Sequence, residues 1–294
     1  MKNKTFVLDI LILSALIVFL FVTAPSPLPL EPEQAKATVP IERVFEMVEA
    51  ENDWVRDLWT KEIVQAGKKV NLEFDEDWRE DDIDAGPLPA LFLRETAKNL
   101  ERHPLRLSLY LGSDFPISAS NRFEGIQLQK FEQIKASNQP QFFFAEDTAL
   151  YTAMFADIAI ANACIRCHND HKESPKSDWK LDDVMGATTW TYPKQKVSLD
   201  ESIEILRLLR NSFKAAYSAY IEKARTFKNP PEIGAKWPRE GYFLPDVDQF
   251  IEEAAQRASI DSLQSLLYMS APVNPNKGLK TPATTTDTSK QDEQ

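Results

Sequence analysis

Both cysteines and two of the three histidines of this 294-residue chain lie within eight residues of the stretch ANACIRCHNDH, at positions 161–171. These residues are Cys164, Cys167, His168 and His171. Thiolates and imidazoles bind transition metals, and thiolates also carry redox chemistry. Most of the metal-binding and redox capacity of the chain is therefore concentrated in one short segment.

Residues 164–168 read Cys-Ile-Arg-Cys-His, the C-x-x-C-H pattern of c-type haem attachment. In that chemistry the two thiols add to the vinyl groups of the porphyrin, and the histidine binds the iron as proximal axial ligand. The sequence therefore predicts one covalent haem c on Cys164 and Cys167, with its iron on His168.

Two other uses of the same residues are open. A redox pair of thiols needs no histidine and usually precedes a helix in a βαβ unit, which the surrounding sequence lacks. A zinc site would take Cys164, Cys167, His168 and His171, but the neighbouring ligands at 167 and 168 fit a tetrahedron poorly. A bare thiol pair and a zinc-stabilised interaction module stay as alternatives to haem.

The N-terminus predicts export. Lys2 and Lys4 precede an apolar run over 6–23, which is about the length that spans a bilayer. We expect an uncleaved signal anchor over 1–24, with a cleaved secretory signal as the alternative. The lysines then stay inside, and the body of the protein lies in the periplasm of a bacterium, attached to the inner membrane by a single helix. Covalent haem attachment takes place on that side of the membrane.

Composition narrows the function. The formal net charge of −11 argues against nucleic acid as a partner, because phosphate binding needs a basic surface. With 8 glycines and no glycine-rich phosphate loop, the chain offers no nucleotide site. We find no nucleophile with an adjacent base, so the sequence predicts a protein that is not an enzyme, with weak haem peroxidase activity as the exception.

The hydrophobic pattern predicts a mixed fold. A Pro-rich linker over 25–39 precedes a helical pattern that starts at Pro40. Alternation predicts a strand over 105–112, and an amphipathic helix follows over 122–136. We expect further strands over 140–147, 149–161 and 184–192. The result is an α+β fold with a small antiparallel sheet and long flanking helices.

After the last strand the chain turns helical again. Ser198 followed by Glu201 is a capping-box start, and apolar residues then recur at helical spacing. A Pro-rich turn leads to a last helix over about 247–267. We expect a helical segment over 196–270 and a disordered, polar tail over 271–294.

The order of these elements resembles the PAS-like haem c sensor domains, an exported family found alone or in front of kinases, cyclases and chemoreceptor modules. RLSLYLGSDFPI, SNRFEGIQLQKFEQI, ACIRCHNDH and DVMGATTWTYP carry the resemblance, over roughly 40–195. It implies a PAS-like domain over 40–195, with haem on Cys164 and Cys167 and iron on His168. No kinase, cyclase or methyl-accepting module follows in this chain.

The second axial ligand of the iron stays open. His103, beside Pro104 and ahead of the first strand, is the first candidate for the distal ligand, although its place favours a solvent-exposed histidine at a helix end. His171 lies too close to His168 in sequence to reach the opposite face of a haem. Met154, Met185 and an empty distal position are further alternatives.

We therefore expect a periplasmic haem protein that senses redox state or a small gas and signals to a separate partner protein. The alternative is a monohaem electron-transfer cytochrome. A carrier keeps two protein ligands on the iron, whereas a gas sensor needs an exchangeable position.

Overall fold

The structure is a computed structural model that describes Ser14, Phe19 and residues 38–160, 162–234, 236–238 and 244–270. Except for those two residues and the last two of the linker, the expected anchor (1–24), linker (25–39) and tail (271–294) lie outside this part of the chain. Among the residues that are described, we find no helix with the length and apolar character needed to cross a membrane.

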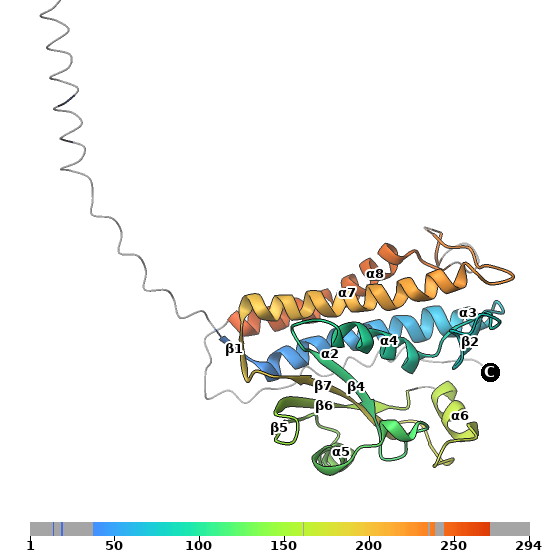
Figure 1. Cartoon of the computed structure of the whole chain (residues 1–294), viewed down its shortest axis with the longest axis horizontal. Coiled ribbons are helices and arrows are strands. Elements are labelled where there is room, and N and C mark those ends of the chain that lie inside the picture. Colours follow the sequence, from blue (N-terminus) through green and yellow to red (C-terminus); the bar gives the residue numbers. More distant parts are fainter. Residues whose placement is uncertain are drawn as a thin grey trace, which may run out of the picture.

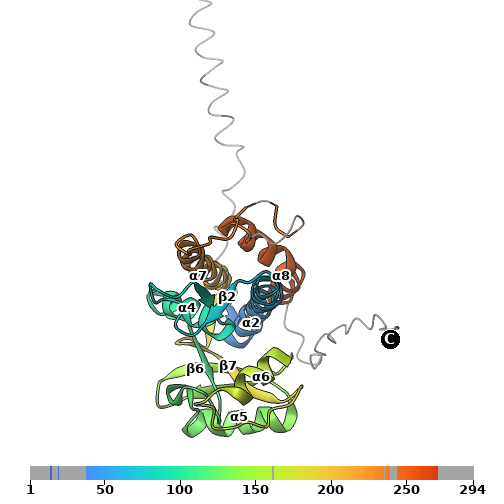
Figure 2. The same cartoon turned by 90° about the vertical axis from the view of Figure 1, so that its right-hand side faces the viewer.

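Four helical segments pack together as a bundle, which forms the helical layer of the molecule and is itself two helices deep (Figures 1 and 2). The first is continuous and combines α2 (Ile41–Asp57), the π-helix η1 (Leu58–Gln65) and α3 (Ala66–Lys68). The others are α4 (Pro89–Glu101), α7 (Leu199–Ala224) and α8 (Val247–Ser270). α7 begins where the sequence predicts, because the Ser198 hydroxyl accepts a hydrogen bond from the Glu201 N–H at 3.1 Å.

A four-stranded antiparallel sheet lies beneath this layer, with strand order β4-β7-β6-β5. Its strands are β4 (Ser108–Gly112), β5 (Gln141–Ala145), β6 (Leu150–Ile158) and β7 (Val184–Tyr192). Two small pairs complete the strands: β1 (Thr38–Pro40) with β8 (Lys196–Ser198), and β2 (Glu73–Asp75) with β3 (Ala85–Pro87). The predicted α+β character and the small antiparallel sheet are confirmed.

The two faces of the sheet meet different partners. Trp190 and Ala153 face the helical layer, where they join the main core with residues of α2, α4, α7 and α8. Met154 and Ala187 face the other way and pack against α5 (Gly125–Ser137) through Phe131. The sheet is thus covered on both sides by apolar contacts.

The main core crosses the expected boundary at 195–196. Trp59 of η1 stacks on Phe92 of α4 with ring centroids 4.4 Å apart, and its edge meets Tyr220 of α7. Tyr217 of α7 stacks on Phe250 of α8 at 4.0 Å. The helices after residue 196 therefore share one core with the helices before it.

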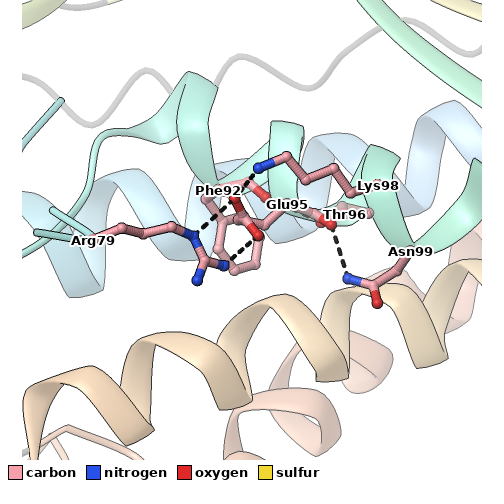
Figure 3. Close-up of polar contacts among 6 residues, drawn as sticks. All are labelled: Arg79, Phe92, Glu95, Thr96, Lys98 and Asn99. Carbon is pink, nitrogen blue, oxygen red and sulfur yellow. Dashed lines mark hydrogen bonds and ion pairs between the residues drawn. The ribbon is translucent and has the colours of Figure 1, made fainter. Parts of the chain in front are cut away.

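Hydrogen bonds hold the acidic segment over 73–84 against α4 and α7. Arg79 donates two hydrogen bonds to the carboxylate of Glu95, one of them at 3.2 Å from Nε, and Lys98 adds a third at 2.8 Å (Figure 3). These cations hold the pKa of Glu95 below its usual value, although partial burial opposes the shift. Lys223 of α7 donates to the Glu80 carbonyl at 2.6 Å. This loop therefore has a fixed position beside the helical layer.

Candidate haem-attachment site

The C-x-x-C-H motif lies on α6 (Asn162–Asp170), a short helix between β6 and β7 at one end of the sheet (Figure 1). At 3.6 residues per turn, Cys164, Cys167 and His168 lie on one side of this helix. Neither cysteine forms a disulfide: Cys164 is half-buried and Cys167 is exposed. The structure therefore brings the three predicted attachment residues together on one helical face.

Hydrogen bonds join the two ends of the segment that contains α6. The Ala159 N–H donates to the Asp183 carbonyl at 2.9 Å, and the Asp182 N–H donates to the Ala159 carbonyl at 3.1 Å. Further out, the Asn169 side chain donates to the Trp179 carbonyl at 3.0 Å and accepts from the Trp179 N–H at 2.9 Å. Asn169, the neighbour of His168, thus fixes the end of the motif helix to the returning chain.

A small apolar cluster supports α6 from below. Trp179, Met185 and Ala159 are buried, and Cys164 and Ile165 pack against them. The indole N–H of Trp179 is buried and has no acceptor among the described residues. Cys164 and Ile165 are therefore held against the end of the sheet, whereas Cys167 of the same helix is exposed.

His171, just after α6, contacts the loop that follows β2. Its Nε2 lies 2.9 Å from the Glu76 carboxylate in the loop after β2, and its Nδ1 accepts from the Glu173 N–H at 3.1 Å. Burial, followed by the negative charge of Glu76, raises the pKa of the Cys167 thiol, while Lys68 at the end of α3 lowers it. Cys167 and His171 therefore lie close to the loop after β2 and to the end of α3, and Figure 1 shows α6 below that end of the helix.

His168 is half-buried, and its ring makes no hydrogen bond within the described part of the chain. Burial lowers its pKa below the usual value, although the charge of Asp157 opposes the shift. Burial therefore favours the neutral imidazole, which is the form that binds a metal through a ring nitrogen.

A cluster of charged residues lies between α2 and the sheet, and the charge of one member, Asp157, acts on His168. We call it the acid–arginine cluster; it consists of Glu49, Asp53 and Arg56 of α2 and Asp157 of β6. Arg56 donates to Asp157 at 2.6 Å and to the Thr188 hydroxyl at 3.4 Å. Glu49 is only 6% exposed and accepts from the Trp190 indole N–H at 2.6 Å.

The two acids of α2 in this cluster hold protons more tightly than free carboxyl groups do. Burial, followed by the charge of Asp53, raises the pKa of Glu49 well above its usual value. Burial also raises the pKa of Asp53 to about 6, against the lowering effect of Arg56. The Asp53 side chain is nevertheless exposed to solvent.

An irregularity in the sheet lies next to this cluster. Asp157 pairs with Gly186, but the next residue, Ile158, pairs with Val184, so Met185 is an extra residue in β7. Such bulges bend a strand and redirect side chains, and they are frequent beside functional sites. Gly186 is required here, because a Cβ atom at this position would lie 2.5 Å from the Gly112 carbonyl oxygen of β4.

The structure does not bring His103 to this site. His103 follows α4, close to the start of β4, whose first residue pairs with Thr191 near the end of β7. α6 precedes the start of β7, so the length of that strand, roughly 25 Å at the usual rise per residue, separates the two places. Met154 lies on the α5 face of the sheet, and Met185 packs beside Cys164.

Sequence reasoning missed the acid–arginine cluster and Asn169. Glu49, Asp53 and Arg56 follow one another at spacings of four and three, so they share a face of α2. That spacing is visible in the sequence, but Arg56 pairs with Asp157, which lies 101 positions away. Only the packing of α2 on the sheet brings Arg56 to Asp157.

This donor set fits covalent attachment of haem c. Two free thiols and an imidazole whose pKa is lowered by burial share one face of a short helix. Within the described residues, no group of three or more His, Cys, Asp or Glu side chains is arranged to hold a metal ion by itself.

Comparison with known protein families adds an independent result. The model of the Tll0287-like family matches residues 34–193, just over half of the chain. The chain belongs to this family. The matched region contains α2 to α6 and the four-stranded sheet, whereas α7 and α8 lie beyond it. No curated protein and no solved structure matches the chain significantly.

Proposed function

We propose that this member of the Tll0287-like family is a membrane-anchored, periplasmic c-type haem protein that senses redox state or a small gas. Cys164 and Cys167 hold the haem as thioethers, and His168 is the proximal iron ligand. The observation that carries the proposal is the placement of these three residues on one face of α6, with both thiols free. When bound, such a haem supplies one-electron redox chemistry and a metal centre for diatomic ligands.

The α+β architecture supports the finer assignment of residues 40–195 to a PAS-like sensor domain. A small antiparallel sheet, covered on one face by long helices and on the other by α5, is what that resemblance implies. The anchor over 1–24 belongs to the same proposal and rests on the charge and apolar length of the N-terminal sequence.

Two observations favour sensing over electron carriage. The α2–η1–α3 helix, residues 41–68, lies near the motif helix and contains no histidine or cysteine, and its one methionine, Met47, is buried in the main core. This helix therefore offers no available side chain of the kinds that bind haem iron at a second axial position. α2 also contacts the helices that follow the sensor region. Its buried Glu51 accepts hydrogen bonds from Arg210 of α7 and Ser262 of α8, and Trp54 donates to Asp261 at 2.8 Å.

These contacts connect α2 with the helices that would respond to a change at the haem. Asp53 and Arg56 lie on the side of α2 that faces the sheet, whereas Glu51 and Trp54 contact α7 and α8. A ligand shifts a conformational equilibrium only by binding two states differently. Because α2 borders both regions, we propose that it transmits the state of the haem to α7 and α8, where a separate partner protein reads it.

An electron-transfer cytochrome is the second candidate, and one observation favours it. Cys167 is exposed, so the haem edge attached to it lies near the surface, where a redox partner can approach. A carrier keeps six-coordinate iron in both oxidation states. A visible spectrum of the oxidised, reduced and CO-exposed protein separates the two functions, because CO binding requires an exchangeable position.

Covalent attachment is tested by expressing the full chain in a host that matures c-type cytochromes. We expect haem to stay with the protein through acid–acetone extraction and denaturing electrophoresis. Cys164→Ala or Cys167→Ala should remove most of it, and His168→Ala should change the spectrum or block maturation. His103→Ala is the matched control, because it replaces the histidine that lies away from the site.

The outcomes are distinct. Colourless wild-type protein with one bound zinc would replace the haem proposal by the zinc-stabilised module. Haem that is retained but never binds CO would favour the electron carrier. Soluble protein in the periplasm, with a mature N-terminus near residue 25, would show that the N-terminal segment is a cleaved signal.

A further inference from the structure

β4 is an edge strand of the four-stranded sheet, and its outer side has no partner strand. It pairs with β7 on one side, in a continuous register from Ser108 to Gly112, and no other described strand pairs with it. In an antiparallel strand, alternate residues direct their N–H and C=O groups away from the neighbour. Within the described part of the chain, backbone hydrogen bonds to segments other than β7 begin only at Ser113, which bonds Asn121 and Phe123. β4 can therefore accept a further strand.

β4 also lacks the features that usually prevent an open edge from associating. Such edges are commonly protected by a lysine, a proline or a bulge. Residues 108–112 read Ser-Leu-Tyr-Leu-Gly, without charge or proline, and their pairing with β7 contains no bulge. Leu109 and Leu111 pack toward the helical layer, whereas Tyr110 packs toward α5. The edge is thus apolar on both faces of the sheet, which suits pairing with another strand.

A groove beside this edge contains unpaired charges of both signs. It has a volume of about 300 Å³ and lies between β4 and α4 (Figure 1). Arg94 and Glu101 are exposed and line it from one side of α4, two turns apart. Neither side chain has an ion pair or hydrogen bond among the residues that the structure describes. Lys98, which lies between them, is already paired with Glu95 at 2.8 Å.

This pattern of charges is self-complementary under a twofold axis. A symmetric dimer of this kind brings the same surface of both copies together, so that residue i meets residue j and j meets i. An axis that passes beside Ala97 and Tyr110, which both line the groove, places Arg94 opposite the partner's Glu101. A purely acidic or purely basic partner would leave one of these two charges beside a like charge. A second copy satisfies both.

From these features we propose that the β4 edge and the exposed side of α4 form a dimer interface with a second copy of this chain. The two β4 strands pair antiparallel, with Leu109 opposite the partner's Leu111, and join the two sheets into one. Arg94 pairs with the partner's Glu101, and the symmetry forms this pair twice. No residue of the interface belongs to α6, and the inference goes beyond the proposed function and does not rest on it.

Charge reversal tests the pairing. The full chain is purified in detergent, and sedimentation equilibrium measures the dissociation constant of the dimer. Arg94→Glu and Glu101→Arg each replace two attractive contacts by two repulsive ones, so each should weaken the dimer at least roughly tenfold. The double variant Arg94→Glu/Glu101→Arg should restore wild-type affinity, because the facing charges are again opposite. Arg225→Glu, at an exposed arginine after α7, is the matched control and should leave the affinity unchanged.

A cross-link locates the axis. The thiol introduced by Ala97→Cys should lie close to the same thiol of the second copy, so mild oxidation of membranes should give a disulfide-linked dimer. Ala136→Cys places a thiol on the exposed side of α5 and should give none. Any cross-link through Cys164 or Cys167 would appear in this control as well.

A monomeric wild type would overturn the proposal. In such a monomer, protection of the thiol at position 97 from a maleimide would indicate that another segment of the same chain fills the groove. A dimer that neither weakens in Arg94→Glu nor cross-links through position 97 would also overturn the proposal, because it would associate through another surface, such as the N-terminal segment. Absence of haem would overturn only the proposed function, since neither measurement depends on haem.

Discussion

Replacing Arg210 by methionine should strongly destabilise the whole protein. Glu51 of α2 is 2% exposed, and its carboxylate accepts two hydrogen bonds from Arg210, one at 3.0 Å from Nε, and one from the Ser262 hydroxyl. Methionine keeps the apolar stem but removes the guanidinium. A buried charge that loses its partner costs about 3–5 kcal/mol. We expect about 3 kcal/mol, because the Arg210 side chain is 35% exposed and water replaces part of the interaction.

Urea unfolding followed by circular dichroism measures this loss. The double variant Glu51→Met/Arg210→Met should recover most of it and retain a deficit of about 1 kcal/mol, because the Ser262 hydroxyl then lacks its acceptor. Arg207→Met is the matched control on α7; Arg207 pairs with Glu204 on the exposed side, and its loss should change stability by less than about 0.5 kcal/mol.

The double variant decides the question. If it is as unstable as the sum of the two single variants, the pair does not act as a unit, and α7 is not fastened to α2 through Glu51. A loss below about 1 kcal/mol for Arg210→Met would refute the reasoning in another way, because it would mean that water reaches Glu51 in the folded protein.

Three further variants test the site. The pKa of Asp53 in the folded protein, about 6, lies above its ordinary value, so the folded state loses stability as pH rises from about 4 to 6. In urea unfolding, Asp53→Asn should match wild type at pH 4 and exceed its stability by about 1 kcal/mol at pH 7.5. The full pKa shift corresponds to about 3 kcal/mol, and the expected effect is smaller because the side chain is exposed. Equal differences at both pH values would contradict this. Asn169→Ala removes both hydrogen bonds to Trp179 and should lower haem attachment and cost about 1–3 kcal/mol by the same assay; unchanged attachment and stability would contradict it. Gly186→Ala forces a Cβ atom against the Gly112 carbonyl oxygen and should cost about 1–3 kcal/mol, and a neutral result would show that the bulge tolerates a side chain.

Local sequence patterns determined most of the secondary structure. The strand predicted over 184–192 is β7 with the same limits, and the helix predicted from Ser198 begins there because the hydroxyl caps it. Glu201 does not complete the capping box as expected, since its carboxylate accepts from Lys194 at 2.8 Å and from Tyr192. Alternation, helical periodicity and capping act between residues a few positions apart, so the sequence displays them directly.

The motif chemistry is also local. Cys164, Cys167 and His168 share a helical face because their spacing matches one turn, which needs no information about the rest of the fold. What surrounds that face is different. The sequence made His103 the first candidate for the distal ligand, but the direction of α4 and the pairing of β4 with β7 place it at the other end of the sheet.

Only the tertiary structure decided which distant residues pair with one another and which helices belong to the core. Arg56 meets Asp157, and Glu51 meets Arg210, across separations of 101 and 159 positions. No periodicity links such pairs, because their approach depends on how α2 packs between the sheet and the last two helices. Burial in that packing also raises the pKa of Glu49 and Asp53, since desolvation depends on the atoms that surround a carboxylate and not on its neighbours in sequence.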